Sequence, residues 1–296
     1  MSNKSLTVRR IIIFCALAFL PIIIITPLMN IYYGELIFVS EKAAAGSYVF
    51  GVVGMLTPAL ANLLTRLITK EGMGNNYLAL KLKGHGGWYA ASLLAVLGEV
   101  AVAMALFCIF YLNGMSFSEI FPSEGISDKA AIVLFQIEYS VIVFFPAFGE
   151  EWGWRGYLMP KLCEVMGKPA AVVVGGIIWG LWHAPLTISG HDFGVDYTGY
   201  PFVGILLMCV LCVAENAFLT LLTEKTGSIY PACFFHMINN NCSMLFFLSI
   251  FGSEQAVAVS DGLPAVQAFL TILLPPTIIL GAIGMFLMLK KPRREA

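Results

Sequence analysis

The chain has 296 residues, of which 59 % are hydrophobic and 12 % are charged, against about 25 % charged in an ordinary soluble domain. Its 17 basic and 18 acidic residues nearly cancel, so no excess of positive charge indicates a nucleic-acid partner. A mean hydropathy of +0.84 excludes a soluble globular protein and a disordered chain, and it leaves an integral, multi-pass membrane protein.

Long apolar runs recur along the whole chain. A membrane-spanning helix needs about 20 mostly apolar residues, and the runs do not alternate as the strands of a barrel do. Eight runs are predicted to span, at about 11–33, 47–68, 88–112, 130–149, 170–188, 202–222, 229–251 and 266–289. The predicted fold is an all-α, polytopic membrane helical bundle of about eight transmembrane helices, forming a single domain over 1–296.

The distribution of Lys and Arg predicts the orientation of this bundle. With the N-terminus in the cytoplasm, 15 of the 17 Lys and Arg residues fall on the cytoplasmic side, and Lys42 and Lys129 fall outside. Both the N- and the C-terminus are therefore predicted to be cytoplasmic. The first run is too long for the apolar region of a signal peptide, so it is predicted to be an uncleaved anchor.

Acidic residues inside membrane spans are functional candidates, because each costs roughly 2.5–3.5 kcal/mol at the centre of a helix. Five lie in or at the edge of the predicted spans: Glu99, Glu138, Glu150, Glu151 and Glu215. Taken singly, Glu99, Glu138 and Glu215 suit either local polar contacts or the relay groups of an ion-coupled transporter. The chain shows no convincing internal repeat, which counts against the transporter.

Glu150 and Glu151 differ from the others because they occur as a pair with a basic partner. Glu151 and Arg155 are four residues apart, which predicts an ion pair on one helical face. Glu150 lies about 100° further round the helix and remains free to act as a general base on water. The alternative is a solvated ion-pair cluster at a helix end.

Two of the four histidines are predicted to lie in the membrane. His183 ends the run GGIIWGLWHAP, and His236 lies in YPACFFHMINNN. Trp179 precedes His183 by four residues, so its indole is predicted to pack beside the imidazole. His85 and His191 occur in polar loops and are predicted to be solvated.

The spacing of polar and small residues adds two further predictions. His236 and Asn240 share a helical face and supply two donors aimed the same way, as an oxyanion site requires. The alternative for the asparagines at 239–241 is hydrogen bonding between helices. Gly176 and Gly180 form a small-residue face that lets another helix approach closely.

Together, the three polar segments resemble the CPBP family of intramembrane proteases, which includes Rce1-like CAAX prenyl endopeptidases and bacterial Abi proteins. The family pattern EExxxR, FxxxH and HxxxN occurs here at Glu150–Arg155, Trp179–His183 and His236–Asn240, within about 140–245. Trp179 stands where the family more often has Phe. Because both residues are aromatic, this departure casts little doubt on the resemblance.

The resemblance implies an intramembrane CAAX-type endopeptidase, a hydrolase that cleaves a membrane-associated or lipidated peptide in the bilayer. The catalytic residues that it implies are Glu150, His183, His236 and Asn240, with Glu151, Arg155 and Trp179 in support. Glu150, oriented by His183, would activate water. His236 and Asn240 would hold the developing oxyanion.

The motifs also fit a metal-dependent version of this hydrolysis. The family is often described as metalloproteases, and Glu150, His183 and His236 could form a zinc site with an open position. The sequence has no HExxH motif, and Asn240 has a defined role without metal, so a reaction that requires no cofactor is favoured over zinc. Outside peptide hydrolysis, the motifs fit a non-catalytic bacteriocin-immunity or scaffold protein, or an ion-coupled transporter.

Overall fold

The computed structural model describes residues 3–290, and every regular element in that range is a helix. Seven helical segments of this range are long and apolar enough to cross a membrane: Lys4–Tyr33, Glu41–Ile68, Gly86–Tyr111, Ser127–Met166, Lys168–Ile188, Phe202–Thr226 and Ala265–Leu289. An eighth crossing arises if α11 (Tyr230–Asn241) and α12 (Met244–Phe251), bent by 45°, count as one span. The predicted all-α membrane bundle is confirmed.

The helix boundaries show where the predicted spans are broken or extended. The main helices of the seven segments are α1 (Asn3–Tyr33), α2 (Ala44–Gly54), α3 (Thr57–Ile68), α4 (Gly86–Tyr111), α6 (Ile126–Gly153), α7 (Met159–Met166), α8 (Lys168–Trp182), α10 (Phe202–Thr226) and α15 (Leu274–Leu289). The remaining helices are α5 (Phe117–Ile120), α9 (Ala184–Ile188), α13 (Glu254–Asp261) and α14 (Ala265–Ala268), with a 3₁₀ turn at Glu41–Ala43 and π-helical turns at Trp154–Leu158 and Phe269–Leu273. The second span breaks before Pro58, a residue suited to the first turn of a helix.

The fourth predicted span, 130–149, is too short. The helical segment continues through the π-helical turn to Met166. Hydropathy ends the run at the polar motif around Glu150, but Glu150, Glu151 and Arg155 are buried and hydrogen-bonded inside the bundle. Their polarity therefore marks a site and not the end of a helix.

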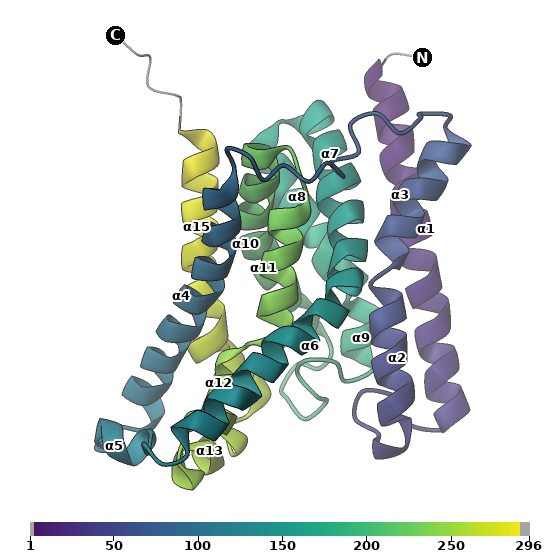
Figure 1. Cartoon of the computed structure of the whole chain (residues 1–296). Coiled ribbons are helices and arrows are strands. Elements are labelled where there is room, and N and C mark those ends of the chain that lie inside the picture. The colour runs from purple at the N-terminus through teal and green to yellow at the C-terminus, as the bar shows by residue number, and fades with distance from the viewer. Residues whose placement is uncertain (1–2, 291–296) are drawn as a thin grey trace.

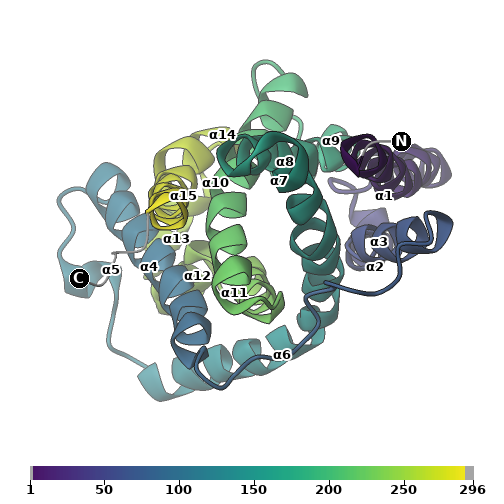
Figure 2. The same ribbon diagram turned by 90° about the horizontal axis from the view of Figure 1, so that it is seen from above.

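The helix α10 lies at the centre of the bundle, where it packs against α4, α8, α11 and α15. Viewed from above, α10 and α11 lie within an arc formed by α15, α4, α6 and the α7–α8 pair (Figure 2). The helices α1, α2 and α3 form a group outside this arc, and both α2 and α3 contact α6. The polar residues of α6, α8 and α11 are thus brought together in the interior.

Close approach of α8 and α10 depends on the predicted small-residue face. A Cβ atom at Gly176 would collide with the backbone of Val213, and one at Gly180 would collide with the backbone of Cys209. No side chain larger than hydrogen fits at either position without moving α10. The prediction from the glycine spacing is confirmed.

The start of α1 and the end of α15 lie at the same end of the molecule (Figure 1). An even number of crossings requires this arrangement. Which compartment this end faces stays a prediction from the distribution of Lys and Arg.

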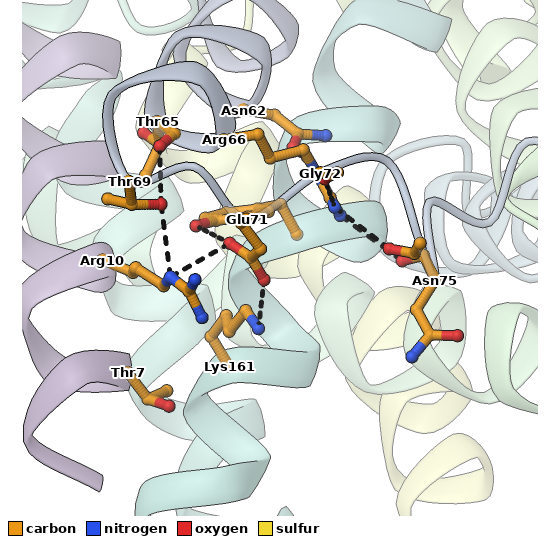
Figure 3. Close-up of polar contacts among 12 residues, drawn as sticks. Thr7, Arg10, Asn62, Thr65, Arg66, Thr69, Glu71, Gly72, Asn75 and Lys161 are labelled. Atoms are coloured by element: carbon orange, nitrogen blue, oxygen red, sulfur yellow. Dashed lines mark hydrogen bonds and ion pairs between the residues drawn. The ribbon is translucent and has the colours of Figure 1, made fainter. Parts of the chain in front are cut away.

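A polar cluster at that end ties α1 to the core (Figure 3). Arg10 on α1 donates to Thr69 at 3.2 Å and lies 3.3 Å from the carboxylate of Glu71. Glu71 also pairs with Lys161 at 2.6 Å and accepts from Tyr157 at 2.9 Å. Burial raises the pKa of Glu71, but these hydrogen bonds and positive charges outweigh it and hold the pKa below its usual value.

Candidate active site

The carboxylate of Glu151 is the anchor of a buried ionic network. It is fully buried, and its Oε1 lies 2.9 Å from a guanidinium nitrogen of Arg155. The same oxygen lies 2.8 Å from Nδ1 of His236, which comes from α11. The predicted ion pair is confirmed, and it also fixes a histidine 85 residues away in sequence.

Glu150 has a different environment from its neighbour. Its side chain is buried, with 2 % of its surface exposed. Its Oε2 accepts the indole N–H of Trp179 at 2.7 Å and that of Trp154 at 3.2 Å. None of the ion pairs among residues 3–290 involves Glu150. Two neutral donors therefore hold this carboxylate in place without neutralising it, as a general base requires.

The π-helical turn Trp154–Leu158 follows directly after the two glutamates. Such turns insert into α-helices at a cost and occur frequently at functional sites. The turn lies fully inside the protein and carries both Trp154 and Arg155. On its N-terminal side, a Cβ atom at Gly153 would collide with the backbone of Pro58, so α6 lies directly against α3 here.

His183 caps the C-terminal end of α8, and its ring is held in one orientation. Its Nδ1 lies 3.0 Å from the carbonyl oxygen of Trp179, so Nδ1 carries the proton in this contact and Nε2 is left as an acceptor. The ring centroid of Trp179 lies 6.1 Å from that of His183, and Trp182 packs edge-on at 4.8 Å. The predicted packing of the Trp179 indole beside the His183 ring is observed.

Trp179 contacts each part of the motif set. Besides its bond to Glu150, its ring packs edge-on against His236, with centroids 5.7 Å apart. The guanidinium carbon of Arg155 lies 4.1 Å from the centre of the same ring. Such a cation–π contact is strongest for Trp. One indole thus links α6, α8 and α11.

A cavity of about 380 Å³ lies at the meeting point of these helices. The predicted site residues that line it are Glu150, Trp179, His183, His236 and Asn240. Glu151 and Arg155 do not line this cavity, but they contact the lining residues His236 and Trp179. The three segments therefore converge on one space, with both carboxylate and imidazole groups facing it.

Several lining or supporting residues were not predicted. Trp154 follows Glu150 by four residues, a spacing that could have indicated its hydrogen bond. His191 is predicted to be solvated, and its side chain is indeed 34 % exposed, but with Asp192 it also lines the cavity beside His183. Their loop returns to the bundle, and no local sequence signal indicates this.

His191 and Asp192 form an ion pair of 2.7 Å at the cavity. Burial lowers the pKa of His191, but the charge of Asp192 and the contact between them outweigh burial and hold that pKa above its usual value. The pair brings both a cation and an anion to the loop side of the cavity.

The described side chains do not form a ready-made zinc site. Glu150, His183 and His236 all face the cavity, but no three His, Cys, Asp or Glu side chains among residues 3–290 are grouped as the ligands of a metal ion. The zinc alternative lacks support in this donor set, as does the metalloprotease assignment.

Comparison with known proteins agrees with the location of the site. No curated protein matches the chain. The family model described as Type II CAAX prenyl endopeptidase Rce1-like matches residues 132–242, from α6 through α11 and thus across all three motifs. The chain is therefore an integral membrane protein in which residues 132–242 are similar to the Rce1-like family.

Proposed function

We propose that the protein is an intramembrane endopeptidase that hydrolyses a peptide bond in a membrane-associated or lipidated peptide, in CAAX-type processing. The observation that carries this proposal is the buried Glu150 carboxylate, which is held by two indoles and faces a cavity shared with His183, His236 and Asn240. The Rce1-like match over 132–242 supports the same reaction class.

In the first step, Glu150 takes a proton from a water molecule in the cavity. The water oxygen attacks the carbonyl carbon of the substrate, a C–O bond forms, and the carbonyl electron pair moves onto oxygen. Nε2 of His183 is the free acceptor of its ring, so it orients the water by accepting its second hydrogen. Neither role requires a metal ion or another cofactor.

In the second step, His236 and Asn240 stabilise the negatively charged oxygen. Nδ1 of His236 is engaged with Glu151, so Nε2 is the nitrogen left for the substrate. Donation from Nε2 requires a doubly protonated ring, and the Glu151 carboxylate 2.8 Å away stabilises that charge. The intermediate collapses when the C–N bond breaks and Glu150 returns its proton to the amine.

Cleavage of prenylated and unmodified fluorogenic peptides by the purified protein in proteoliposomes tests this proposal. Glu150→Gln should lower kcat by about 10²- to 10⁴-fold, the usual contribution of a general base. Glu138→Gln is the matched control, because Glu138 lies on the same helix with an exposed side chain outside the cavity lining. Equal activity of wild type and Glu150→Gln would remove the proposed base.

A further inference from the structure

A second cavity of about 380 Å³ adjoins the candidate active site. Six residues line both cavities: Asp192, Met208, Leu211, Glu215, Asn239 and Asn240. A peptide bound across Glu150 can therefore extend a side chain into the second space without leaving the protein.

Two carboxylates from different helices face the second cavity. Glu99 on α4 is 8 % exposed, and neither of its oxygens has a hydrogen-bond partner in the part of the chain that the structure describes. The neighbouring hydroxyl of Thr277 donates to the carbonyl oxygen of Leu273 at 3.2 Å. Glu215 on α10 is also 8 % exposed and accepts one hydrogen bond, from Asn239 at 3.1 Å.

The charge around the two cavities is unbalanced. No Lys or Arg among residues 3–290 lines either cavity. Asp192 is paired with His191, whereas Glu99 and Glu215 form no ion pair with any residue that the structure describes. Two such carboxylates repel each other, and an unpaired charge inside a membrane bundle is costly. Each group needs a proton or a bound cation, and a cation that displaces the protons would satisfy both groups at once.

We propose that the second cavity is a specificity subsite that binds a lysine or arginine side chain of the substrate peptide, close to the scissile bond. This inference rests on the proposed endopeptidase function. The walls contributed by Val100, Ala103 and Leu273 suit the methylene stem of such a side chain. Glu99 and Glu215 receive its charged end. The subsite thus selects a substrate by the charge of its side chain, in addition to any selection by a lipid attached to the substrate.

Paired peptides test the subsite. Lysine is compared with norleucine, which has a similar aliphatic chain but no ammonium group, at each position flanking the cleaved bond. At one position, wild type should prefer lysine by about tenfold or more in kcat/KM, as a charged hydrogen bond in a buried site predicts. Glu99→Gln should reduce that ratio to near one, and Glu138→Gln should leave it unchanged. Glu215→Gln provides the same measurement if Glu99→Gln does not fold.

Binding to the Glu150→Gln protein separates this inference from the proposed function. Fluorescence anisotropy of both labelled peptides measures the lysine preference without catalysis. If lysine is preferred in binding and Glu99→Gln abolishes that preference, the subsite stands even when wild type cleaves nothing. If both peptides bind and react equally at every position, the proposed subsite is wrong. Cleavage that depends on Glu150 would still support the proposed endopeptidase function in that case.

Discussion

The buried Glu151–Arg155 pair should contribute far more to stability than an exposed pair of similar geometry. In the buried pair, the side chains are 0 % exposed and the atoms lie 2.9 Å apart. Lys168 and Glu224 lie 2.7 Å apart, but both side chains are 35 % exposed. The two pairs therefore differ mainly in access to solvent, which makes Glu224→Gln a matched control.

Replacing Glu151 leaves two groups without their partner. The guanidinium of Arg155 donates to Glu151 through Nη1, whereas its Nε and Nη2 have no hydrogen-bond partner among the described residues. His236 loses its Nδ1 contact in the same variant. Removing one member of a buried pair costs about 3–5 kcal/mol, so Glu151→Gln should lower the free energy of unfolding by that amount. Glu224→Gln should lower it by about 0–1 kcal/mol.

Unfolding in mixed micelles titrated with a denaturing detergent measures these differences. A double-mutant cycle with Arg155→Met isolates the ionic contribution, because methionine fills part of the space without a charge. The double variant should lose about 1–3 kcal/mol less than the sum of the single losses. Additive losses, or a loss in Glu151→Gln no larger than in Glu224→Gln, would show that the buried pair does not anchor the site.

Two further predictions concern Glu150 and the polar cluster around Glu71. Trp179→Phe keeps the aromatic ring but removes the 2.7 Å bond to Glu150, so kcat for peptide cleavage should fall about tenfold. Trp154→Phe removes the longer 3.2 Å bond and should cost less, and the reverse order would contradict this assignment. The pKa of Glu71 is lower in the folded protein, so its stabilising contribution is present above the unfolded pKa of about 4.3 and is lost as pH falls through the folded value. The midpoint temperature of thermal unfolding should therefore fall more steeply at acidic pH in wild type than in Glu71→Gln. Parallel plots of this temperature against pH for the two proteins would exclude this role.

Contacts that depend on helical spacing could be predicted from the sequence. The ion pair of Glu151 with Arg155 and the packing of Trp179 on His183 both follow from a separation of four residues. The close approach of α8 to α10 follows from the spacing of Gly176 and Gly180. In each case, the period of the helix determines which side chains share a face. The eight apolar runs are predictable for the same reason, since bilayer thickness fixes their length.

Contacts between helices could not be predicted in this way. The bond from His236 to Glu151 joins residues 85 positions apart, and its existence depends on how α11 crosses α6. The approach of His191 to the cavity depends on the path of a loop, which hydropathy does not record. The resemblance named the residues of the site, but the bonding of Glu150 to two indoles required the packed structure.

The acidic residues show why the cost of burial alone does not identify a function. Hydropathy treats Glu99, Glu138 and Glu215 alike, because each interrupts an apolar run. In the structure, Glu138 is exposed on α6, Glu215 is partnered by Asn239, and Glu99 is buried with both oxygens unpartnered among the described residues. An exposed carboxylate needs no ligand, whereas a buried one needs a proton, a partner or a bound cation. That requirement at Glu99 makes the charge of the substrate a property that the protein can select.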